Sequence, residues 1–212
     1  MIRFASLALL TLVAGLAAAQ NDAPIPRPNV KPGDSWGYRR TDYLTGQHSG
    51  RIQMEVTFAN DRVIQLVQRN ANKDDDIDVT MTAEWNQINS GNSGVFNPHN
   101  GILKFPLRTG DSWTSKYDVK FPREGDYEVK HDRKVRAVGW EQIEVPAGRF
   151  RALKVVSEGT FFRVDRGVSG TVTEAVWYVP EVKRFVKWTF ENQTPRGRQQ
   201  WWGWELLDYK VQ

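Results

Sequence analysis

The sequence lacks cysteine altogether and has few histidines. No cysteine occurs among its 212 residues, so disulfides and thiol chemistry are excluded, and we expect no lipid anchor of the bacterial lipoprotein type. The three histidines, His48, His99 and His131, stand at no metal-ligand spacing from one another. The glycine-rich loops that hold phosphates and the G-x-S-x-G motif of many hydrolases are also missing. The sequence therefore predicts no catalytic residue, no metal site and no cofactor.

Long apolar runs are also scarce, and the one that stands out is at the N-terminus. Arg3 gives a positive start, residues 5–16 are mostly apolar, and residues 17–19 are three alanines suited to signal-peptide cleavage. This run is shorter than the ~20 residues that span a bilayer as a helix, and no later segment is long and apolar enough to do so. We therefore expect a signal peptide over residues 1–19. The product should be an exported, soluble protein without a transmembrane segment, either periplasmic or secreted.

Helical periodicity is hard to find beyond this signal peptide. Residues 20–33 carry four prolines and predict an extended Pro-rich leader. Over residues 34–212 apolar residues alternate with polar ones, which indicates strands with one buried face. We expect a single all-β domain of about ten strands with little helix, forming a strongly curved antiparallel sheet that is either a half-barrel or a barrel-like sandwich. The strands are expected at residues 35–44, 51–58, 62–69, 77–85, 113–121, 126–138, 150–165, 168–179, 184–192 and 199–210, with residues 86–101 as a polar connection.

A four-residue sequence, GDSW, occurs twice. It stands at residues 33–36 and again at residues 110–113, and each copy follows a proline-containing loop and opens an expected strand. Two interpretations stay open. Either the domain consists of two related halves (34–100 and 101–212), or the same turn chemistry begins two strands without duplication.

The overall charge is modest. The net charge is +4, and the 29 Lys and Arg are scattered among the 25 Asp and Glu, so we expect no nucleic-acid partner, which would need a clustered basic surface. One acidic cluster, Asp74, Asp75, Asp76 and Asp78, supplies the oxygen ligands that calcium prefers. It lacks the glycine and the downstream glutamate of the known calcium loop, so a solvated hairpin tip is the favoured interpretation.

Two hairpin motifs resemble a known family. Residues 145–155 have the sequence VPAGRFRALKV, and residues 177–187 have the sequence WYVPEVKRFVK. In this order, downstream of the G-x-x-W opening at residues 110–113, they resemble the TapB-like family of exported bacterial β-proteins of unknown function. The resemblance extends over residues 105–209, and Lys183 departs from it where the family often has glycine. The resemblance implies a distant similarity, at the level of the fold alone, to the half-barrels of periplasmic lipoprotein carriers, which shield acyl chains against a concave sheet.

Alternation places three polar side chains among apolar ones. His131 and Arg133 share a face with four apolar residues of their expected strand, and Glu174 lies between two valines. A buried charge is unfavourable unless it is paired, so an inward Arg133 should meet a carboxylate such as Glu174 or Glu205, or line a wet cavity. Three interpretations stay open for His131, Arg133 and Glu174: a solvated face, a structural ion pair, or a ligand site.

Nine tryptophans are many for this length. Trp202 and Trp204 share one face of an expected strand, and Leu206 continues their alternation, so we expect both rings to lie on the inner face and to be largely buried. With Trp177 and Trp188 they either fill a wide core or form an aromatic platform for an apolar or amphipathic ligand. The basic residues that could meet an anionic head group there are Lys183, Arg184, Lys187, Arg196 and Arg198.

These features favour a non-enzymatic, exported binding protein whose curved sheet accommodates an apolar or amphipathic, lipid-like small molecule. The main alternative is an envelope accessory module with a filled core, which docks another envelope protein through strand edges or aromatic patches. A hydrolase with an unrecognised site is a second alternative. A cavity lined by the tryptophans would favour ligand binding, and a solid core with an exposed apolar patch would favour the accessory module.

Overall fold

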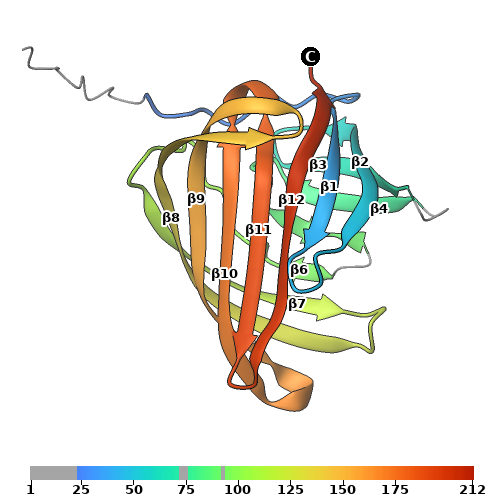
Figure 1. Cartoon of the computed structure of the whole chain (residues 1–212), viewed down its shortest axis with the longest axis vertical. Helices are drawn as coiled ribbons and strands as arrows, with labels where there is room; N and C mark the ends of the chain where they lie inside the picture. The colour runs from blue at the N-terminus through green and yellow to red at the C-terminus, as the bar shows by residue number, and fades with distance from the viewer. Residues whose placement is uncertain (1–22, 72–75, 92–93) are drawn as a thin grey trace, which may run out of the picture.

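In the computed structural model, which describes residues 23–71, 76–91 and 94–212, the chain forms a closed antiparallel β-barrel (Figure 1). Its strands follow one another around the barrel in chain order, and β12 pairs with β1 to close it. The strands are β1 (Ser35–Asp42), β2 (His48–Ala59), β3 (Val63–Asn70), β4 (Ile77–Thr82), β5 (Gln87–Asn89), β6 (Val95–Asn97), β7 (Ser112–Phe121), β8 (Tyr127–Val145), β9 (Gly148–Arg163), β10 (Val168–Val179), β11 (Arg184–Thr194) and β12 (Gly197–Lys210). Two 3-10 turns, η2 (Val164–Arg166) and η3 (Pro180–Val182), join β9 to β10 and β10 to β11. In this described part of the chain, no helix has the length and apolar character needed to cross a membrane.

The architecture confirms the all-β antiparallel prediction and corrects it in one respect. The expected strands are present, but the sheet closes into a twelve-stranded barrel instead of ending as a half-barrel or sandwich. Closure depends on β5 and β6, two strands of three residues each, inside the connection predicted for residues 86–101. Strands this short show no alternation in the sequence, which is why about ten strands were predicted. The predicted signal peptide, residues 1–19, lies outside the described residues.

The interior of the barrel is the hydrophobic core. Along β2, Ile52, Met54 and Val56 are buried, as their alternation predicts. Phe58 breaks the pattern and its ring is exposed, since the register of β2 against β3 shifts between Val56 and Phe58. A register shift of this kind turns the following side chains toward the other face of the sheet.

The connection between β6 and β7 occupies part of the interior. Eight strands already enclose about as much space as side chains can fill, so twelve strands leave more. Here Ile102, Leu103 and Leu107 of the connection are buried in the core. Ile25 of the leader is buried as well, and it exchanges backbone hydrogen bonds of 2.8 and 2.9 Å with Leu107. The leader therefore contributes a side chain to the core.

The two GDSW copies open β1 and β7 with the same turn. Gly33 and Gly110 have φ values of 90° and 89°, in the left-handed region that glycine favours. The side chains of Asp34 and Asp111 each accept a hydrogen bond of 3.0 Å from the backbone N–H three residues earlier. The repeated sequence therefore encodes the same strand opening twice.

Candidate functional site

Arg184 is a buried arginine inside the barrel, with 1% of its surface exposed. It is the first residue of β11 and follows Lys183, whose φ of 60° turns the chain back into the sheet. This is a conformation that glycine favours, so the turn exists even though lysine stands where the resembling family often has glycine. The Lys183 ammonium lies 3.1 Å from the buried carboxylate of Asp34, which fixes this end of the hairpin.

Aromatic rings surround the Arg184 guanidinium. Its Cζ lies 4.5 Å from the ring centroid of Trp85, 5.1 Å from that of Phe185 and 5.2 Å from that of Trp36. Each such contact is worth roughly 2 kcal/mol when it is desolvated, which offsets only part of the cost of burying a charge. Within the described residues no carboxylate forms an ion pair with Arg184, and burial lowers its pKa. Because arginine stays protonated in proteins, the site holds an unpaired positive charge.

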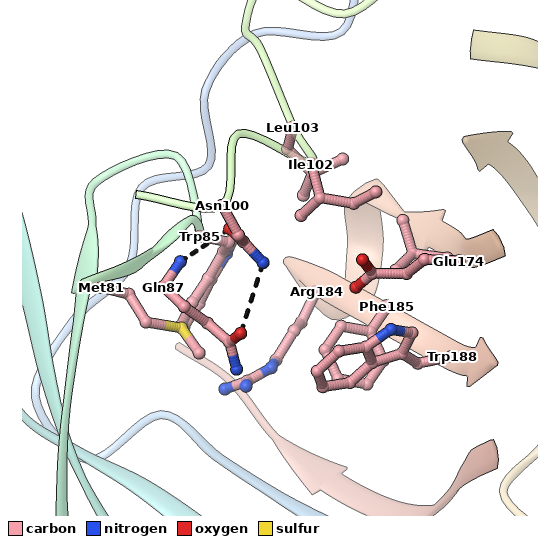
Figure 2. A pocket seen from close by; sticks show the side chains of 11 residues that line it. Met81, Trp85, Gln87, Asn100, Ile102, Leu103, Glu174, Arg184, Phe185 and Trp188 are labelled. Carbon is pink, nitrogen blue, oxygen red and sulfur yellow. Dashed lines mark hydrogen bonds between the residues drawn. The ribbon is translucent and has the colours of Figure 1, made fainter. Parts of the chain in front are cut away.

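Two nitrogens of this guanidinium have no hydrogen-bond partner. Arg184 Nη2 lies 3.2 Å from Met54 Sδ, a weak acceptor, whereas Nε and Nη1 are buried without any partner. Arg184 lines a cavity of about 20 Å³, which is room for about one water molecule. The other residues that line it, most of them labelled in Figure 2, are Met81, Trp85, Gln87, Asn100, Ile102, Leu103, Glu174, Val176, Phe185 and Trp188.

Two further polar side chains of the cavity wall are Trp188, which has an unpaired hydrogen-bond donor, and Asn100, which is already hydrogen-bonded. Trp188 Nε1 is another buried donor without a partner. On the opposite side, Asn100 Oδ1 accepts the Gln87 backbone N–H at 2.9 Å, and Asn100 Nδ2 donates to Gln87 Oε1 at 3.3 Å (Figure 2). A buried donor without an acceptor is unfavourable by about 1 to 3 kcal/mol. The arrangement is therefore suited to a ligand that supplies acceptors.

Glu174 also lines the cavity, but its charge is already compensated. It forms an ion pair with Arg133 in which the two side chains are 4% and 3% exposed. The expectation that an inward Arg133 meets a carboxylate is thus confirmed. His131 Nδ1 accepts a hydrogen bond of 3.2 Å from Arg133 Nη2, and the His131 ring stacks on Tyr117 with centroids 4.7 Å apart. The uncompensated charge at the cavity is that of Arg184.

His131 makes the stability of the barrel depend on pH. Burial, and secondarily the charge of Arg133, lowers the pKa of His131 from 6.5 to about 3. Between these values the unfolded chain binds a proton that the folded chain excludes, so the free energy of unfolding falls as the pH drops through this window. We expect His131→Gln, which keeps an acceptor for Arg133 but does not titrate, to reduce this loss by up to about 1.4 kcal/mol per pH unit. Guanidinium unfolding at a series of pH values tests this, and parallel curves for the two proteins would contradict it.

Aromatic rings continue from the cavity along the inner face toward the β11–β12 hairpin. Trp188 lies 5.0 Å from Trp202 and 5.7 Å from Trp204 between ring centroids, and Phe190 stacks on Trp202 at 5.1 Å. Trp202 and Trp204 share the inner face with buried Leu206, as predicted. The prediction that they are largely buried is met only in part, because both rings are half-buried. At this end β9–β12 extend beyond the shorter β1 (Figure 1), so the inner face is not covered by a full ring of strands.

Trp177 lies apart from this aromatic group, on the outer face of β10. Its Nε1 donates to Glu141 at 2.8 Å, and the ammonium groups of Lys154 and Lys187 lie 5.0 and 5.7 Å from its ring centroid. Alternation along β10 already separates Trp177 from the inward Glu174, so the sequence contained this signal. The structure brings the other predicted site residues into one connected set of contacts, namely His131, Arg133, Glu174, Trp188, Trp202 and Trp204.

Of the basic residues considered for a head group, only Arg184 lies inside the barrel. Lys183 pairs with Asp34, Lys187 lies over Trp177 on the outside, and Arg196 and Arg198 are exposed at the β11–β12 hairpin. Of the acidic cluster, Asp76 forms an ion pair with Arg69 at 3.2 Å and Asp78 is exposed on β4, so neither of these described residues lines the cavity. Asp74 and Asp75 lie outside the described residues.

Comparison with known proteins defines the fold class. No family model matches the chain, and no curated protein matches it. Among solved structures, it is similar to the crystal structure of a protein from Parabacteroides distasonis described as a candidate lipoprotein, with a TM-score of 0.50, 15% identity, and coverage of 88% of this chain and 97% of that chain. It is also similar to a candidate exported protein with a YmcC-like fold from Bacteroides fragilis, with a TM-score of 0.48, 14% identity, and coverage of 89% and 100%. At 15% identity the first of these similarities shows a shared fold alone, and the resemblance to TapB-like proteins stays a prediction.

Proposed function

We propose that this protein is an exported, non-enzymatic binding protein that holds an amphipathic ligand against the inner face of its barrel. One observation carries the proposal: the half-buried rings of Trp188, Trp202 and Phe190 lead to a cavity whose N–H donors have no partner. A core built only for stability would bury such rings fully and satisfy such donors.

The exposed part of the aromatic group suits the apolar portion of a ligand. Burial of apolar surface contributes ~25 cal/mol per Å², so an alkyl chain that covers roughly 200 Å² gains roughly 5 kcal/mol. The rings lie in contact with one another before any ligand arrives, and little side-chain ordering is then required on binding. An alkyl chain along Trp202 and Phe190 would direct its other end toward Trp188 and the cavity.

The titratable side chains at the site suit binding rather than catalysis. Arg133 and Glu174 are engaged in their mutual ion pair, and a pKa of about 3 keeps His131 neutral at physiological pH. A general base works best when its pKa lies near the working pH, which is not the case for His131. We therefore propose no chemical conversion of the ligand.

Export is proposed from the signal-peptide features of residues 1–19. The structurally similar protein from Parabacteroides distasonis is described as a candidate lipoprotein, which agrees with an envelope location. We expect the exported product to begin at Gln20 and to carry no lipid. Intact-mass measurement of the exported fraction tests this, and a mass that retains residues 1–19 or includes a lipid would contradict it.

The accessory-module alternative also has an observation in its favour. The cavity beside Trp188 has room for about one water molecule, at about 20 Å³, so this part of the interior is nearly filled. If the tryptophans only fill the core, the protein will bind no amphipathic probe.

Displacement of a fluorescent fatty acid separates the two functions. We expect the wild type to bind the probe and Trp202→Ala to weaken binding by about 10-fold or more, which is about 1.4 kcal/mol. Trp177→Ala is the matched control, because it removes the same ring from the outer face, and it should leave the affinity unchanged. A wild type that binds no probe would contradict the proposed function and favour the accessory module.

A further inference from the structure

We propose that Arg184 is the anion-binding group of this site, and that the ligand carries a singly charged acidic head group such as a carboxylate. The inference deepens the proposed function and rests on it for the apolar part of the ligand. The anion site itself is supported by separate observations on charge, hydrogen bonding and shape.

The first observation is the charge balance of the cavity. Arg184 is 1% exposed and has no ionic partner among the described residues, whereas Arg133 and Glu174 neutralise each other. The cavity wall therefore carries one surplus positive charge that is shielded from water. The aromatic rings around Arg184 attract the cation but bring no negative charge.

The second observation is the direction of the unmet hydrogen bonds. Arg184 Nε, Arg184 Nη1 and Trp188 Nε1 are all donors, they are all buried, and none has an acceptor. Both side chains line the same cavity (Figure 2). A carboxylate compensates the charge and accepts hydrogen bonds through two oxygens, so it would supply both the missing counter-charge and acceptors for these donors.

A purely structural role explains Arg184 less well. Well-packed apolar side chains commonly replace buried charges at no loss of stability, so a methionine or leucine would fill this position equally well. A water molecule in the cavity can accept one or two of the hydrogen bonds, yet it leaves the charge uncompensated. An anionic ligand satisfies both requirements.

The shape of the cavity restricts the head group. A volume of about 20 Å³ leaves little room beyond one water-sized group. A phosphate has four oxygens and a carboxylate has two, so the limited space favours the smaller head group. We therefore infer a preference for a carboxylate over a phosphate.

Calorimetric titration with decanoate, decanol and decyltrimethylammonium tests the head group, because the three share one alkyl chain. We expect the wild type to bind decanoate at least about 10-fold more tightly than decanol, and decyltrimethylammonium most weakly. In Arg184→Met the preference for decanoate over decanol should disappear. Equal binding of decanoate and decanol by the wild type would overturn the anion site and leave the proposed function standing.

Acetate alone tests the anion site without an alkyl chain. We expect acetate to raise the melting temperature of the wild type relative to chloride-matched controls, and to have no such effect on Arg184→Met. If neither decanoate nor decanol binds but acetate acts in this selective way, the anion site stands and the proposed function fails. If acetate has no selective effect and decanoate shows no preference, the inference is overturned.

The stability of unliganded Arg184→Met shows whether Arg184 has a binding role or a structural role. Removing an uncompensated buried charge should leave unliganded Arg184→Met at least as stable as the wild type, whereas a structural arginine would make it clearly less stable. Arg184→Gln serves as a second variant if the methionine variant does not fold. The wild-type comparison of decanoate with decanol needs neither variant.

Discussion

Arg133→Ala lowers the free energy of unfolding by about 3 to 5 kcal/mol, because it leaves the carboxylate of Glu174 buried without its partner. The substitution also removes the guanidinium from its contacts with the rings of Tyr117 and Phe190, whose centroids lie 5.3 and 5.9 Å from it. The loss is therefore expected to be among the largest for any single polar residue of the barrel. Guanidinium unfolding at neutral pH measures it directly.

Two controls show whether the unpaired charge is the cause. Arg136→Ala breaks an ion pair on the same strand, that of Arg136 with Glu158 at 2.9 Å, in which the side chains are 51% and 52% exposed. This variant should lose less than about 1 kcal/mol, since exposed pairs contribute little. The double variant Arg133→Met with Glu174→Leu should recover most of the stability, because no charge is left buried. Equal losses for Arg133→Ala and Arg136→Ala would contradict the buried ion pair.

Trp36→Ala is expected to cost about 3 to 5 kcal/mol, the range for truncating a fully buried large aromatic side chain. Trp36 is 0% exposed, its Nε1 donates to the Val182 carbonyl oxygen at 2.9 Å, and it packs edge-on against Trp85 with centroids 5.4 Å apart. Its loss would open a void beside Arg184 as well as remove apolar contacts. The wall of the candidate site is thus also a main part of the core.

Trp202→Ala is the informative comparison for Trp36→Ala. Its ring is half-buried, so we expect a loss of only about 1 to 2 kcal/mol of stability, together with the loss of fatty-acid affinity. Denaturant unfolding and probe displacement on the same two variants separate the roles. A stability loss for Trp202→Ala as large as that for Trp36→Ala, with no change in probe binding, would assign Trp202 to the core and not to a ligand site.

The faces of long strands could be predicted from the sequence because period two is a local property. On β8 alternation put His131 and Arg133 on one face with apolar neighbours but left open whether that face was solvated, and the structure shows that Arg133 is buried. The cost of burying a charge predicted a carboxylate partner for an inward Arg133, either Glu174 or Glu205, and the structure shows that it is Glu174. Alternation along β10 puts Trp177 on the face opposite to Glu174, so it could also have separated Trp177 from the inner-face tryptophans.

Other parts of the site had no local signal. On β11 Phe185 and Val186 are both buried, so alternation cannot assign a face to Arg184 at the start of that strand. Asn100 reaches the cavity from an irregular connection, whose path depends on the closed barrel around it. Trp85 was expected at the inward end of the strand over residues 77–85, and it is buried, but β4 ends at Thr82. The cavity therefore arises from long-range packing that no single stretch of sequence specifies.

Native mass spectrometry of the mature protein, isolated from the envelope of its own cells, tests the central claim most directly. We predict that the wild type carries one small amphipathic molecule with an acidic head group, and that decanoate displaces it. Arg184→Met and Trp202→Ala should each be isolated largely without this molecule, whereas Trp177→Ala should retain it. A wild type that is isolated with no bound molecule, and that takes up neither decanoate nor decanol, would contradict the account.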